Sequence, residues 1–246
     1  MVSVLSLLSN PPEDGVQIWT SHLEKLSPVE LSEIGASLDA GEQARASRFH
    51  FERDRQLYVA SRGLLRRLLG DALDQPASAV LLTYGEHGKP ALGAGTGGNR
   101  TLHFNISHSA GWAMFALAWD REVGIDLESA ARLKGDANNL AGLAARVLSA
   151  RELTIWQALP EGDKREAAFL RAWTRKEAFA KAVGGGLFEH LVRTDVALDA
   201  KTPTPSLVLQ SSESGQAPRT WTLHDIKAPD GFFAALALEQ KCGQPA

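Results

Sequence analysis

The sequence predicts an α+β protein made of two similar lobes, in which each lobe is a long helix packed on a small, mostly antiparallel sheet. Two repeated features indicate this fold. The stretch 111–118 (GWAMFALA) is echoed by 231–238 (GFFAALAL), 120 residues later. A basic helical stretch lies upstream of each, at 62–70 and at 176–184, and these are 114 residues apart. Matched order and nearly matched spacing predict two copies of one unit.

The boundary between the two copies is expected near Asp120. Residues 1–120 then form an N-terminal lobe and residues 121–246 a C-terminal lobe. Ligands tend to bind where domains meet, so the active site is expected in the cleft between the lobes.

Hydrophobic spacing predicts the elements of the first half. A helix is expected at 28–38, where Ser27 suits the N-cap and Pro28 the first helical position. The stretch 41–69 has strongly helical spacing. Strands are expected at 16–19, 80–84, 103–109 and 111–119.

The second half repeats this mixture of helices and strands. Residues 141–159 have helical spacing. The stretch 167–184 is alanine-rich without internal proline or glycine, and three glycines at 184–186 end it, so it is the clearest helix of the chain. Short strands are expected from residue 192 onward, including 221–226 and 232–238.

Composition excludes several classes of protein. The 246 residues are 44% hydrophobic and 22% charged, which is typical of a globular protein, and the net charge of −3 attracts neither nucleic acid nor an anionic membrane. The single cysteine, Cys242, excludes an intrachain disulfide and a cysteine-built metal site. No apolar run approaches the roughly 18 residues of a membrane span, and the apolar stretch 1–9 is too short for a signal peptide. A cytoplasmic protein is expected.

The stretch 123–128 (VGIDLE) has the period of a half-buried strand. Its three apolar residues point to one face, and Gly124, Asp126 and Glu128 point to the other. The two carboxylates are then about 7 Å apart at their α-carbons. Two hard oxygen ligands on a rigid strand suit Mg²⁺. Taken alone, however, such a pair is more often the solvated acidic face of a strand.

Basic and hydroxyl side chains in the first half suit phosphate. Between Arg45 and Arg67 there are seven arginines against two acids, which gives this segment a charge near +5. Such a segment fits either a solvated helix face with ion pairs or a surface that binds phosphates through paired hydrogen bonds. Ser107 and His108 end a predicted strand, and Lys89 lies in a glycine-flanked turn.

Four motifs in the chain together resemble the signatures of the 4′-phosphopantetheinyl transferases. They are GKP at 88–90, FNISHS at 104–109, VGIDLE at 123–128 and WTRKEAFAK at 173–181. Their order is similar to that of the two-lobed monomeric branch that serves non-ribosomal peptide and polyketide synthases. The resemblance implies transfer of the phosphopantetheine arm of coenzyme A to a serine of an apo acyl or peptidyl carrier protein, with release of adenosine 3′,5′-bisphosphate.

The resemblance also implies roles for single residues. By motif match, the Mg²⁺ ligands are Asp126, Glu128 and Glu177. The residues expected to hold the phosphates of coenzyme A are Arg45, Lys89, Ser107, His108 and Lys181. Trp173, on the same helix face as Glu177 and Lys181, is interpreted as core packing beneath the site. The carrier protein is expected to be an acidic helical domain that complements the arginine-rich first half.

The base that removes the proton of the carrier serine stays open at this stage. Glu152 resembles an acid of the family that serves this role, and Glu177 or a metal-bound water are alternatives. Two other functions would use the same acids. One is a metal-dependent nucleotide pyrophosphohydrolase, which needs no acceptor protein. The other is a non-catalytic carrier-protein or nucleotide-binding module, in which the acids only stabilise the contact between lobes.

Overall fold

The computed structural model describes residues 4–8, 15–85, 89–93, 100–133, 137–184, 194–202, 207–209 and 218–240. Gly88, the glycines at 185 and 186, and Cys242 lie outside these ranges. In the described part of the chain, none of the helices combines the length and the apolar character needed to cross a membrane.

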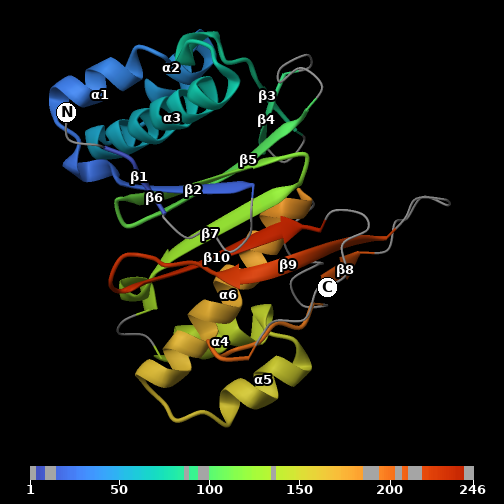
Figure 1. The fold of residues 1–246 in the computed structure, drawn as a ribbon. Coiled ribbons are helices and arrows are strands. Elements are labelled where there is room, and N and C mark those ends of the chain that lie inside the picture. The colour runs from blue at the N-terminus through green and yellow to red at the C-terminus, as the bar shows by residue number, and fades with distance from the viewer. Residues whose placement is uncertain are drawn as a thin grey trace.

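The N-terminal half is a four-stranded antiparallel sheet with helices on one face (Figure 1). The strands lie in the order β1 (Ser6–Leu7), β2 (Val16–His22), β6 (Trp112–Trp119) and β5 (Leu102–Ser109). The helices are α1 (Pro28–Gly35), α2 (Ala40–Ala46) and α3 (Glu52–Leu73), with short 3₁₀ turns at Leu23–Lys25 and Ala77–Ala79. A separate hairpin pairs β3 (Leu82–Tyr84) with β4 (Pro90–Leu92).

The C-terminal half repeats this plan. Its strands lie in the order β7 (Val123–Ser129), β10 (Phe232–Glu239), β9 (Arg219–Asp225) and β8 (Leu207–Leu209), again antiparallel. The helices are α4 (Ala137–Val147), α5 (Ala150–Gln157) and α6 (Asp163–Val183), and a 3₁₀ turn spans Ala130–Leu133. Because β2–β6–β5 corresponds to β7–β10–β9 and α3 to α6, the predicted α+β fold of two similar lobes is confirmed.

Two predicted helices are each divided in two. The stretch 41–69 becomes α2 and α3, since α2 ends at Ala46 and α3 begins only at Glu52. The stretch 141–159 becomes α4 and α5, because the Ser149 side chain accepts a hydrogen bond from the Glu152 amide and starts a new helix with a capping box. Hydrophobic spacing continues across both breaks and therefore does not reveal them.

Helix α6 is longer than expected. It begins at Asp163, four residues before the predicted start, and it ends at Gly184, whose φ of 76° is the left-handed conformation that glycine adopts without strain.

The two sheets pack face to face through a shared apolar core. Met114 and Ala116 of β6 lie against Ile125 and Leu127 of β7 and Leu236 of β10, all of them buried. On the outer side of each sheet a second core holds the long helix, α3 on one half and α6 on the other. Figure 1 therefore shows four layers, in the order helix, sheet, sheet, helix.

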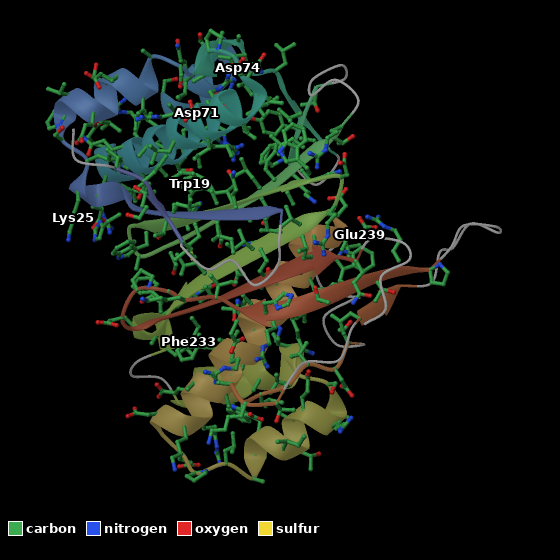
Figure 2. All side chains as sticks on the ribbon, in the orientation of Figure 1. Trp19, Lys25, Asp71, Asp74, Phe233 and Glu239 are labelled. Atoms are coloured by element: carbon green, nitrogen blue, oxygen red, sulfur yellow. The ribbon has the colours of Figure 1, made fainter. Side chains whose placement is uncertain are left out.

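Aromatic side chains fill the contacts between each sheet and its helices. Trp19 of β2 packs on the core beneath α3, and Phe233 of β10 packs on the core of α6 (Figure 2). Asp120, in the turn between β6 and β7, has a φ of 59°. The division of the chain into domains at this residue stays a prediction.

Candidate active site

Strand β7 lies directly against helix α6 at Gly124. A β-carbon added there would lie 2.0 Å from the carbonyl oxygen of Ala178, so only glycine fits this contact. Asp126 and Glu128 follow on the same face of the strand, as the alternation predicts. The alternative of a solvated acidic face does not hold, since these side chains are buried beneath α6, with Asp126 3% and Glu128 9% exposed.

The two carboxylate oxygens of Asp126 differ in their contacts. Its Oδ1 accepts hydrogen bonds from Lys181 Nζ at 2.6 Å and from Ser107 Oγ at 3.0 Å. Its Oδ2 is buried and has no hydrogen-bond partner among the described residues. A buried carboxylate oxygen without a partner is costly, so this atom is available to a ligand that the protein itself does not supply.

Glu128 accepts hydrogen bonds on both oxygens. Arg132 Nη1 at 2.7 Å and Trp173 Nε1 at 3.2 Å donate to Oε1, and Ser109 Oγ at 3.3 Å donates to Oε2. Trp173 therefore packs on the core of α6, as expected, and also holds an acid of the site. The contacts of Arg132 and Ser109 were not predicted, because no sequence spacing shows which donors of other elements reach Glu128.

Glu177 lies among these acids. Burial raises its pKa to about 7, and the charges of Asp126 and Glu128 act in the same direction, while Lys181 opposes them. The three predicted metal ligands thus lie near enough for their charges to act on one another. Their shared negative charge favours a cation at this place.

The donor set fits a magnesium ion that shares its coordination with substrate. No three His, Cys, Asp or Glu side chains of the described residues are arranged as a ready-made metal centre. Mg²⁺, however, usually takes one or two carboxylates and completes its six ligands with phosphate and water. The Oδ2 of Asp126, which has no partner among the described residues, is an oxygen that such an ion could bind.

The positive charges of Lys181 and Arg62, one from each half of the protein, act on His108. Its pKa is lowered, first by partial burial and then by the charges of Lys181 and Arg62. Arg62 of α3 lies over the rings of Tyr58 and Tyr84, 5.8 and 5.7 Å from their centroids, and its Nη1 is a buried atom without a partner among the described residues. Arg62 was one of seven arginines in the predicted basic segment, and nothing in the sequence distinguished it.

Arg45 belongs to the same aromatic group. Its guanidinium lies 5.5 Å from the centroid of the Tyr58 ring, which Arg62 also contacts. Both tyrosines and Arg45 line a cavity of about 210 Å³. Arg45 is therefore near Arg62, although the structure shows no contact between it and the acids of β7.

Lys89 joins the two halves. Its Nζ donates to the Ala182 carbonyl oxygen at 3.0 Å, at the C-terminal end of α6, and lies 3.3 Å from Glu122 Oε2. His103 Nδ1 lies 3.4 Å from the other oxygen of Glu122. The structure thus pairs Lys89 with Glu122 and does not bring its ammonium to the acids of β7.

Glu152 is not brought to the acidic group. Its side chain is almost fully buried, 2.6 Å from Lys176 Nζ, and it accepts hydrogen bonds from the amides of Ser149 and Val196 at 2.7 and 2.6 Å. Lys176 is itself fully buried. A carboxylate held in this way stabilises the packing of α5 on α6, and the expectation that it acts as a base gains no support from this geometry.

Comparison with known proteins identifies the family. The model of the 4′-phosphopantetheinyl transferase superfamily matches residues 122–237, and that of the 4′-phosphopantetheinyl transferase N-terminal region matches residues 25–119. The chain is 34% identical to the 4′-phosphopantetheinyl transferase HetI of Nostoc sp. over 98% of its own length and 93% of that protein. The chain belongs to the 4′-phosphopantetheinyl transferases.

More distant relatives include animal members of this family. The chain is 29% identical to the L-aminoadipate-semialdehyde dehydrogenase-phosphopantetheinyl transferase of Xenopus laevis, over 80% of this chain and 67% of the relative. For the human protein of that name the identity is 26%, over 84% and 69%. The predicted resemblance to the two-lobed monomeric kind of phosphopantetheinyl transferase is confirmed, and the protein is a transferase.

Proposed function

We propose that this transferase moves the 4′-phosphopantetheine arm of coenzyme A to a serine of an apo acyl or peptidyl carrier protein, with Mg²⁺, and releases adenosine 3′,5′-bisphosphate. The observation that carries the proposal is the meeting of two groups of opposite charge where β5 and β7 adjoin. The acids Asp126, Glu128 and Glu177 lie beside the cations Lys181 and Arg62 and the imidazole of His108. A pyrophosphate bound together with a metal ion would use both groups, the acids for the metal and the cations for the phosphate oxygens.

The cations suit the phosphates of coenzyme A. Lys181 Nζ donates to Asp126 Oδ1 and, at 2.9 Å, to Ser107 Oγ. The ammonium therefore contacts one side chain of the C-terminal half and one of the N-terminal half. Arg62 and His108 lie on the side of the N-terminal half. Phosphoryl transfer depends mainly on positioning and on neutralising charge, which these side chains provide without covalent participation.

Bound magnesium would offset the charge that develops on the leaving phosphate. Asp126, Glu128 and Glu177 would hold it, with substrate oxygens as further ligands. The serine hydroxyl of the carrier attacks the phosphorus that bears the pantetheine arm, and the bond from that phosphorus to adenosine 3′,5′-bisphosphate breaks. We assign the hydroxyl proton to Glu177, because it lies with the acids of β7, whereas Glu152 is buried against Lys176.

The proposal also covers the oligomeric state, the location and the binding partners of the protein. We infer a cytoplasmic monomer that acts on carrier proteins and on coenzyme A, and binds neither nucleic acid nor membranes. Arg45, Arg48 and Arg67 of the arginine-rich segment are exposed on the N-terminal half and complement an acidic carrier domain.

Mass spectrometry of a carrier protein tests the proposal. The protein is incubated with coenzyme A, Mg²⁺ and an apo carrier domain, in the presence and absence of EDTA. We expect a gain in carrier mass of one phosphopantetheine group and its loss with EDTA. Release of adenosine 3′,5′-bisphosphate without a gain in carrier mass would instead favour the pyrophosphohydrolase.

A further inference from the structure

Three side chains of β5 bind the backbone of β7. Asn105 Oδ1, Ser107 Oγ and Ser109 Oγ accept hydrogen bonds from the amides of the residues 20 positions later, at 3.0, 3.1 and 3.1 Å. These amides belong to Ile125, Leu127 and Ser129. β5 and β7 are edge strands of different sheets, so side chains here replace the backbone ladder that would otherwise pair the two strands.

The two serines make a second contact that Asn105 does not make. Ser107 donates to Asp126 Oδ1 at 3.0 Å, and Ser109 donates to Glu128 Oε2 at 3.3 Å. Each serine therefore binds an acid of β7 and the amide that follows that acid. The corresponding position for Asn105 is Gly124, which has no side chain. The pattern repeats with the period of two residues that both strands share.

This double contact fixes the acids relative to the other half of the protein. A hydroxyl has one proton to donate and two lone pairs to accept. Because the amide of Ser129 occupies a lone pair of Ser109 from a fixed direction, the hydroxyl proton is directed toward Glu128. Hydrogen bonds to metal-binding carboxylates orient them and commonly change metal affinity by 10–100-fold.

We propose that Ser109, together with Ser107, is a positioning residue that orients the metal-binding carboxylates of β7 from the opposite half of the protein. The proposal rests on the proposed function, since it takes Glu128 as a metal ligand. Ser109 is the residue to test, because Ser107 also contacts Lys181 and its substitution would change two contacts at once.

The test measures Mn²⁺ binding to the protein without substrate, by the loss of the free Mn²⁺ signal in electron paramagnetic resonance. We expect Ser109→Ala to weaken Mn²⁺ binding by roughly 10-fold. Ser109→Thr keeps the hydroxyl and is expected to restore the affinity of the unsubstituted protein. Unchanged affinity in Ser109→Ala would overturn the proposal.

Asn105 provides the matched control. Asn105→Ala removes the same kind of side-chain contact to the β7 backbone but touches no acid, so we expect a lower Tm and unchanged Mn²⁺ affinity. Equal loss of affinity in Asn105→Ala and Ser109→Ala would show that strand pairing alone is responsible and would also overturn the proposal. If Asn105→Ala does not fold, Asn105→Ser replaces it as the control. A serine hydroxyl accepts a hydrogen bond from a β7 amide at the next two positions of this pattern, Ser107 and Ser109.

Two results separate this proposal from the proposed function. If the unsubstituted protein binds no Mn²⁺, the metal assignment fails and the positioning role of Ser109 fails with it. If Mn²⁺ binds and weakens in Ser109→Ala, but no carrier protein gains mass, the positioning role is supported and the transfer reaction is not.

Discussion

Lys181 and Asp126 show how single side chains prepare the site. The ammonium lies 2.6 Å from one carboxylate oxygen of Asp126, while the other oxygen is buried and without a partner among the described residues. One oxygen is therefore satisfied by the protein, and the second would bind the proposed metal ion. The four-residue spacing of Glu177 and Lys181 on α6 is commonly only that of a surface ion pair, but here Lys181 pairs with Asp126 of β7.

Substitution of Asp126 tests this arrangement. We expect Asp126→Asn to lower kcat/KM for carrier modification by roughly 10³-fold, because the metal loses a charged ligand, with little change in the circular dichroism spectrum. Asp120→Asn is the control. Asp120 is a surface acid paired with Arg100 in the turn before β7, and its loss should leave transfer unchanged. Retained activity in Asp126→Asn would contradict the metal assignment.

Glu152 and Glu177 differ in what each is expected to do. Glu152→Gln leaves the buried Lys176 ammonium without its counter-charge, so we expect the free energy of unfolding to fall by about 3–5 kcal/mol. Chemical denaturation measures this change. At a temperature where the variant stays folded, transfer should be retained.

Glu177→Gln is the matched comparison for Glu152→Gln. It is expected to lose transfer while keeping its stability, since it removes a buried carboxylate whose charge is unfavourable in the folded protein. The opposite pattern in the two variants would return the role of base to Glu152.

At the scale of elements, the contact of α6 with β7 brings the acids of the strand and the helix together. This contact depends on Gly124, where an added β-carbon would also lie 2.4 Å from the Ala182 amide nitrogen. The backbone of both elements would have to move apart to accept a side chain. Lys181 and Glu177 would then move away from Asp126.

We expect Gly124→Ala to lower the free energy of unfolding by about 3 kcal/mol or more and to reduce transfer strongly, because the added methyl group overpacks two backbones. Thermal unfolding and the carrier mass assay measure the two effects. Gly142 of α4 is the control, because an added β-carbon there would have no neighbouring atom within 4 Å. Gly142→Ala should leave the free energy of unfolding unchanged or raise it by up to about 1 kcal/mol. Similar effects of both substitutions would contradict this account of the α6 contact.

The sequence allowed most elements to be predicted, because the periods of the strands and helices follow from burial on one side. It did not show where a helical pattern is interrupted, as at Ser149, because capping competes locally with a continuous hydrophobic pattern. The acids of β7 and Glu177 were predicted as one group from motifs. The sequence did not show the partners of Lys89 and Glu152, since the partner of each lies on an element distant in sequence.

At the scale of the whole molecule, Glu122 connects the halves through Lys89 and His103. Burial would raise the pKa of Glu122, but the hydrogen bond and charge of His103 and the charge of Lys89 outweigh it and lower the pKa from 4.5 to about 2. A carboxyl whose pKa is lower in the folded protein than in the unfolded chain stabilises the folded protein at every pH above its pKa in the unfolded chain. This contribution is lost as the pH falls from about 4.5 toward 2.

We therefore expect Glu122→Gln to be less stable than the unsubstituted protein at pH 7, by on the order of 2 kcal/mol after allowance for its partial exposure. The difference should shrink as the pH falls below 4.5. Urea denaturation of both proteins at a series of pH values measures it. A difference that is constant between pH 7 and pH 3 would contradict the role of this ion pair.

The apolar core between the two sheets has a consequence for a chain that is cut in the turn at Asp120. Each fragment would carry its own helix and sheet, with one wide hydrophobic face exposed to water. Burial of these faces favours reassembly of the fragments from solution, in the manner of a split reporter. Neither fragment holds both the acids and the full set of cations, so transfer should return only when the two are mixed. The transfer activity recovered on mixing would then measure how strongly the two hydrophobic faces associate.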